Sequence, residues 1–177
     1  MKPKFTPRGY TLIEMLLVLA IMALLAVTSF PMFGMFRKMA GYAGCISNLR
    51  ILHVGLNTYM QDHEMVWPQV PEGGYEDENK EWKWWNDTLK DYGVATTHWV
   101  CPSDDTQRGL GEDDPDAKGE TYKGSYTVTL FDDGPNTAFR WNQPWAIERG
   151  GYHKKFEGPN MLMPDGTIMS GPALMSR

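Results

Sequence analysis

RGYTLIEMLLVLAIMALLAV, residues Arg8–Val27, decides the architecture of this chain because nearly all of it is apolar. Its only acidic residue is Glu14, and no charged residue lies between Met15 and Phe36. As an α-helix that uncharged run would be about 33 Å long, which matches the hydrocarbon thickness of a bilayer. The sequence therefore predicts a membrane-spanning helix near the N-terminus, with a carboxylate close to its start that requires an explanation.

Charge is divided unevenly along the 177 residues. Residues 1–50 carry six basic side chains against Glu14 alone, whereas the remainder carries 11 basic and 21 acidic ones. The acidic part disfavours nucleic acid as a partner, because phosphate binding needs clustered Lys and Arg. The basic leader favours a cytoplasmic N-terminus. Arg37 and Lys38 favour the opposite orientation, but the first flank usually dominates, so we expect everything after about residue 38 to lie outside the cytoplasm.

The residues before the apolar run, RGYTLIE, resemble the processing signature of type IV prepilins and type II secretion pseudopilins. The resemblance implies cleavage after Gly9 by a prepilin peptidase and N-methylation of Tyr10. It also assigns Glu14 to the acidic position of that signature, and Pro31 to a helix kink. Tyr10 replaces the commoner Phe. An ordinary secretory signal is the alternative, although the apolar run is long and no small-x-small cleavage site follows it.

Glu14 calls for a partner, since a charged carboxylate at the centre of a membrane helix costs about 2.5–3.5 kcal/mol. The freed amine of Tyr10 on a neighbouring subunit is the natural candidate, because Tyr10 and Glu14 are one helical turn apart. Pairing across staggered helices would set their register in the membrane or filament. In the alternative, Glu14 reaches the cytoplasmic interface and has no further role.

The helix is expected to continue beyond the membrane and to become amphipathic. Apolar or aromatic side chains recur at helical spacing and predict one buried stripe, made of Tyr42, Ile46, Leu49, His53, Leu56 and Met60. We predict a single kinked helix from Tyr10 to about His63. The predicted organisation is a leader (1–9), an apolar helical half (10–36), an amphipathic helical half (37–63) and a globular part (64–177).

The globular part resembles a pseudopilin-like group with a C-terminal Asp-Gly motif. CISNLR, CPSD, GSY and the final PDG segment carry this resemblance. His153 precedes Asp165 by eleven intervening residues, where that group has nine, so the resemblance assigns His153 no role. Strand-like residues from Gly124 to Phe131, and a hairpin around Asp165 and Gly166, predict a small antiparallel sheet. The fold class is therefore α+β and pilin-like, with Asp165 as a turn former.

The two cysteines, Cys45 and Cys101, are expected to lie outside the cytoplasm, where disulfides persist. A bridge between them would tie the globular part to the helix. Two buried free thiols are the alternative.

An acidic run after Cys101 offers oxygen ligands of the kind that Ca²⁺ requires, and some major pseudopilins hold calcium in a C-terminal loop. The candidate ligands are Asp104, Asp105, Asp113, Asp114 and Asp116. The spacing matches no defined calcium loop, so a solvated charged loop is the alternative.

Three clustered tryptophans, Trp82, Trp84 and Trp85, are either core residues or an exposed platform for sugar rings or cargo. No nucleophile–base arrangement predicts an enzyme. The sequence thus predicts a filament subunit of a type II secretion pseudopilus or type IV-like pilus. Its expected partners are other pilin-like subunits and an inner-membrane assembly platform. A tethered carbohydrate- or cargo-binding module is the alternative function.

Overall fold

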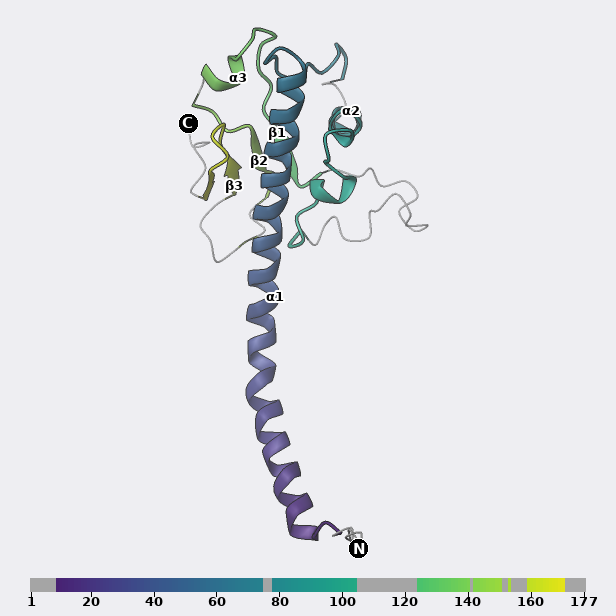
Figure 1. Ribbon diagram of the computed structural model, residues 1–177, viewed down its shortest axis with the longest axis vertical. Coiled ribbons are helices and arrows are strands. Elements are labelled where there is room, and N and C mark those ends of the chain that lie inside the picture. Colours follow the sequence, from purple (N-terminus) through teal and green to yellow (C-terminus); the bar gives the residue numbers. More distant parts are fainter. Residues whose placement is uncertain are drawn as a thin grey trace, which may run out of the picture. The chain divides into compact units, whose positions relative to one another are not determined.

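The computed structural model describes residues 9–74, 78–104, 124–140, 142–150, 153 and 159–170. A long N-terminal helix is followed by short helices and a small antiparallel sheet, which confirms the predicted α+β class (Figure 1). The elements are α1 (Leu12–Asp62), α2 (Glu78–Lys90), the 3₁₀ helix η1 (Thr96–Trp99), β1 (Tyr126–Val128), α3 (Thr137–Arg140), β2 (Ala146–Glu148), β3 (Asn160–Leu162) and β4 (Ile168–Ser170). The chain divides into Met1–Met39, here called the N-terminal unit, and Ala40–Arg177, here called the head.

Most of the described side chains of the N-terminal unit are apolar and exposed. Its exposed side chains include Leu12, Ile13, Met15, Leu16, Leu17, Val18, Leu19, Ile21, Met22, Leu24, Leu25, Val27, Phe33, Met35, Phe36 and Met39. Exposed apolar surface of this extent marks a contact with a membrane or with other chains. No single described helix is long and apolar enough to cross a membrane alone. Leu12–Thr28 and Phe33–Asp62 meet that criterion together, by length and composition, as a bent pair whose break contains Pro31.

Both ends of α1 have local causes. Thr11 and Glu14 form a capping box at its start. The backbone N–H and hydroxyl of Thr11 donate to Glu14 Oε2 over 2.7 and 2.8 Å, and the Glu14 N–H donates to Thr11 Oγ1 over 3.4 Å. The helix ends where Glu64 and Met65 adopt positive φ angles of 53° and 63°, which turn the chain out of the helix. Neither is a glycine, yet the predicted end near His63 lies one residue from the observed end at Asp62.

The sheet is an antiparallel meander in the order β1-β2-β3-β4. The predicted strand Gly124–Phe131 contains β1, but only its three central residues pair. The predicted hairpin around Asp165 is present as β3 and β4, with Asn160 opposite Ser170 and Leu162 opposite Ile168. β2 was not predicted, because its three residues are too few to show an alternating pattern.

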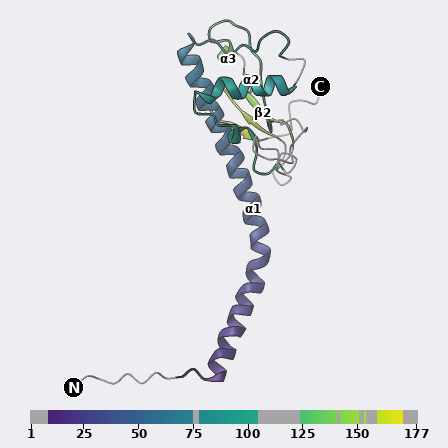
Figure 2. The same ribbon diagram turned by 90° about the vertical axis from the view of Figure 1, so that its right-hand side faces the viewer.

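The segment after residue 64 also contains a helix where short strands and turns were expected. Residues 78–90 form α2, which Figure 2 shows crossing the head-side part of α1. Its tryptophans therefore follow helical spacing, with Trp82 and Trp85 one turn apart.

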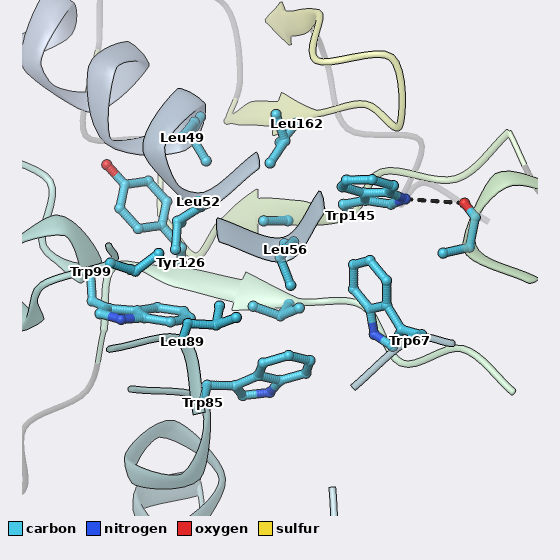
Figure 3. Close-up of a cluster of buried hydrophobic side chains, with 14 of the residues drawn as sticks. Leu49, Leu52, Leu56, Trp67, Trp85, Leu89, Trp99, Tyr126, Trp145 and Leu162 are labelled. Atoms are coloured by element: carbon cyan, nitrogen blue, oxygen red, sulfur yellow. Dashed lines mark hydrogen bonds between the residues drawn. The ribbon is translucent and has the colours of Figure 1, made fainter. Parts of the chain in front are cut away.

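The core of the head forms around the second part of α1, where Leu49, Leu52 and Leu56 are fully buried. Figure 3 shows these leucines among aromatic side chains from the rest of the head, including Trp67 and Trp145, whose ring centroids are 5.2 Å apart. The predicted stripe is slightly rotated from the observed one. Leu49, Leu56 and Met60 are fully buried as predicted, whereas Tyr42, Ile46 and His53 are only half-buried. Cys45 and Leu52, which the prediction left out, are fully buried.

Glycines on α1 allow the head to approach the helix backbone. A Cβ at Gly44 would lie 2.8 Å from Pro102 Cγ, and one at Gly55 would overlap Val94 Cγ2. A Cβ at Gly41 would overlap Ser103 Oγ. Gly41, Gly44 and Gly55 lower helix propensity, but in this structure the absence of a side chain at each lets a residue of the head pack directly against the α1 backbone.

Replacing Gly55 by Ala is expected to destabilise the head by about 1–3 kcal/mol, because the added methyl group would overlap Val94 Cγ2. The sign of the change in unfolding free energy distinguishes a packed from an open position. At an open helix position, replacing Gly by Ala would instead stabilise the protein by about 1 kcal/mol. Urea unfolding of the full chain in detergent, followed by tryptophan fluorescence, measures the change.

The control is the double variant Gly55→Ala/Val94→Ala, in which the clashing methyl group is removed. Its loss of stability is expected to be smaller than the sum of the two single losses. A Gly55→Ala chain that is as stable as the wild type would show that α1 and the Val94 segment do not pack this closely.

Candidate functional site

The predicted processing site lies just before the first turn of α1. Gly9 and Tyr10 are exposed and precede the helix, and the Tyr10 side chain keeps 80% of its surface accessible. Glu14 follows in the first helical turn, where its carboxylate accepts both hydrogen bonds from Thr11. The bond between Gly9 and Tyr10 is therefore accessible, and the carboxylate of Glu14 is held at the same end of the helix.

The C-terminal Asp-Gly turn lies against α1. Asp165 Oδ1 accepts hydrogen bonds from the Thr167 backbone N–H at 2.9 Å and from its hydroxyl at 2.6 Å, and Gly166 has a φ of 80°. Pro164 O lies 3.1 Å from His53 Nε2 on α1, and His53 stacks on Trp145 with ring centroids 5.0 Å apart. Asp165 thus acts as the predicted turn former, and the hydrogen bonds from Thr167 hold the pKa of its carboxyl below the usual value.

A disulfide joins Cys45 on α1 to Cys101 after η1, as predicted, with their Cα atoms 4.9 Å apart. For a sequence separation of 56 residues, the loop-entropy estimate is about 4 kcal/mol of stabilisation. Asn48 Nδ2 donates to Val100 O over 2.8 Å close to the bridge. A covalent bond and a hydrogen bond therefore both join the helix to the rest of the head.

The CPSD and GSY segments meet beside this disulfide. Ser125 Oγ accepts from the Cys101 N–H at 2.9 Å and donates to Asp104 Oδ2 at 2.7 Å. Asp104 was predicted as a calcium ligand on an open loop. It is instead fully buried, and its carboxylate accepts the hydrogen bond from Ser125 inside the head. The other four predicted calcium ligands, Asp105, Asp113, Asp114 and Asp116, lie outside the described residues.

The proposed aromatic platform does not form as an exposed surface. Trp85 is buried, with 2% of its surface accessible, and Trp82 and Trp84 are partly buried against the core. Trp84 and Trp85 make an edge-to-face contact with centroids 5.0 Å apart. Of the two alternatives for this cluster, the structure favours core packing, because α2 places Trp85 in the core and the three tryptophans do not share one exposed surface.

Two polar residues lie beside the disulfide at positions that the sequence did not predict. His153 Nε2 lies 3.5 Å from Cys101 Sγ, and Glu148 Oε1 lies 3.3 Å from the same nitrogen. Glu148 ends β2, a strand too short to be recognised, and the spacing of His153 from the Asp-Gly turn gave no indication of its neighbours. Only the folded chain brings these residues together.

Comparison with known proteins identifies one feature. Residues 6–30 match the family model of the prokaryotic N-terminal methylation motif. No curated protein and no solved structure matches the chain. The match supports a prepilin-type signature at the N-terminus, and with it a pilin-like precursor whose N-terminal helix is a membrane anchor.

The Asp-Gly turn yields a pH-dependent prediction. Asp165→Ala is expected to lower the stability of the head at neutral pH, because Thr167 loses its acceptor. Asp165→Asn is expected to be intermediate, since it keeps an acceptor oxygen but loses the charge. The folded-state pKa of Asp165 is lowered, so the advantage of the wild type over Asp165→Asn is present above the usual Asp range. It is lost as the pH falls through the lowered pKa.

Thermal unfolding of both variants between pH 7 and pH ~2 measures this difference, since the range spans the titration of ordinary aspartates. A wild-type advantage over Asp165→Asn that stays constant across the range would contradict the assignment.

Proposed function

We propose that this chain is a pilin-like subunit that is cleaved after Gly9, methylated at Tyr10 and polymerised through its apolar helix. The assembly would be a type II secretion pseudopilus or a type IV-like pilus. The observation that carries the proposal is the methylation motif at residues 6–30, placed at the start of a helix whose apolar side chains are exposed as far as Met39.

Before assembly the chain would be a single-pass protein of the bacterial inner membrane with its head in the periplasm. The basic leader supports this orientation through the positive-inside tendency. Its partners would be the prepilin peptidase, an assembly platform in the inner membrane and other pilin-like subunits. Removal from the membrane would expose the apolar helix, and burial against neighbouring helices would compensate for the lost lipid contact.

Glu14 would have two roles in this scheme. Within one chain it completes the capping box with Thr11. In the filament it would neutralise the Tyr10 amine of a neighbour, an amine that exists only after cleavage. The capping box supports this second role because it keeps the carboxylate in the first turn of α1, next to residue 10.

The carbohydrate-binding alternative rested on an aromatic platform that includes Trp85. Because that side chain is buried, the alternative loses this platform.

The mature N-terminus is the direct test of processing. Mass spectrometry of the chain from its native host is expected to show a start at Tyr10 with one added methyl group. Gly9→Leu is the control and is expected to remain uncleaved. An intact Met1, or a start near residues 27–30, would overturn the proposal, since the latter indicates an ordinary secretory signal.

Glu14 can be tested by separating its charge from its capping ability. Glu14→Ala removes both, whereas Glu14→Gln keeps an acceptor that suits a capping box. Both variants are expected to lower incorporation into filaments at least about tenfold, because a buried amine left without its partner costs about 3–5 kcal/mol. Immunoblotting of sheared filaments against total membrane-bound chain measures incorporation. If Glu14→Gln assembles like the wild type, capping alone explains this residue and the intermolecular pairing is wrong.

A further inference from the structure

Four potential metal ligands meet where α1 joins the head. The sulfur atoms of Cys45 and Cys101, a carboxylate oxygen of Glu148 and a ring nitrogen of His153 all lie within 4.8 Å of one another. All four residues are buried, with at most 7% of their surface accessible. They come from α1, from the turn after η1, from the end of β2 and from residue 153, so the fold assembles them rather than any local sequence motif.

The separations of these atoms resemble those in a tetrahedral metal site. With Zn–N and Zn–O bonds of about 2.1 Å and Zn–S bonds of about 2.3 Å, tetrahedral angles place nitrogen and oxygen about 3.4 Å apart. The same geometry places nitrogen and sulfur about 3.6 Å apart. The observed distances from His153 Nε2 are 3.3 Å to Glu148 Oε1 and 3.5 Å to Cys101 Sγ. These two separations match those of a tetrahedral site, whereas the two bonded sulfur atoms must move apart to reach it.

Glu148 supplies an independent indication that a ligand belongs here. Its Oε1 atom is buried and has no hydrogen-bond partner among the described residues, although His153 Nε2 lies 3.3 Å away. Within the described part of the chain no hydrogen bond supplements this ion pair, so the buried carboxylate oxygen is incompletely satisfied. Its second oxygen, Oε2, accepts the Asn160 backbone N–H over 2.9 Å. That bond orients the carboxylate in the way that outer hydrogen bonds orient metal ligands, and leaves Oε1 directed at the cluster.

We propose that Cys45, Cys101, Glu148 and His153 bind one Zn²⁺ when the disulfide is reduced. A dithiol reductant would supply two electrons and two protons, so that the S–S bond breaks, two thiols form and the dithiol becomes a disulfide. Metal binding then displaces both thiol protons to solvent, and the two sulfur atoms separate to about 3.8 Å in a tetrahedral site. Paired thiolates with imidazole favour zinc over the hard cations.

The disulfide and the metal are thus alternative cross-links between the same parts of the molecule. In the oxidised chain both sulfur atoms are bonded to each other and neither is a thiolate ligand. In the reduced chain the metal would hold α1 to the head in its place. A head that has not yet been oxidised would therefore keep its core closed on the helix when zinc is present.

The test uses the full chain in detergent, in oxidised form and after anaerobic reduction, titrated with Co²⁺ and then Zn²⁺. The reduced chain is expected to bind one Co²⁺ with a thiolate-to-cobalt charge-transfer absorption, which Zn²⁺ abolishes by displacement. Reduced Glu148→Gln and His153→Gln are expected to bind at least about tenfold more weakly. Glu72→Gln, which changes an exposed carboxylate elsewhere in the head, is the matched control and should bind like the wild type.

Near-ultraviolet circular dichroism of the tryptophans reports whether the reduced head stays folded. Zinc is expected to preserve this signal in the reduced wild-type chain. It is also expected to raise the midpoint of thermal unfolding of the reduced chain, but not the midpoint of the oxidised chain. The proposal is overturned if the reduced chain binds no metal, or if it unfolds with zinc present. It is also overturned if binding is unaffected by replacing Glu148 and His153, or equally strong in the oxidised chain.

Discussion

The packing of the head around the second part of α1 is the constraint on which the rest of the structure depends. Leu49, Leu52 and Leu56 supply the centre of a core that the short strands could not form alone, because each strand is only three residues long. The same helix carries an exposed apolar surface as far as Met39. One element therefore presents an exposed apolar surface in its first part and packs against the chain's own head in its second.

Three features secure the packing of the head on α1, and each comes from a different part of the sequence. Gly55 allows Val94 to approach the helix backbone, the Cys45–Cys101 bridge fixes the junction covalently, and the Asp-Gly turn lies against His53. The proposed zinc site lies at the same junction. If the four ligands act as proposed, the redox state of one cysteine pair changes the type of cross-link while the packing of the core is kept.

The sequence was most informative where a pattern is long or chemically specific. The apolar run predicted α1, the two cysteines predicted their bridge, and Asp165 with Gly166 predicted the hairpin turn. It was least informative where tertiary packing decides. The burial of Trp85 depends on α2, and the meeting of Glu148 with His153 depends on a three-residue strand. The T-x-x-E spacing of Thr11 and Glu14 is a capping-box signature, so this contact too is predictable from the sequence.

The central claim is that the chain assembles through the first part of α1. Its most direct test is a photo-cross-linking residue placed at Leu16 or at Val54, two α1 positions that are both 60% exposed. In cells that assemble filaments, Leu16 is predicted to give abundant adducts with a second pilin-like chain, and Val54 far fewer. Adducts from Val54 alone, or from Leu16 to lipid alone, would contradict assembly through the apolar helix.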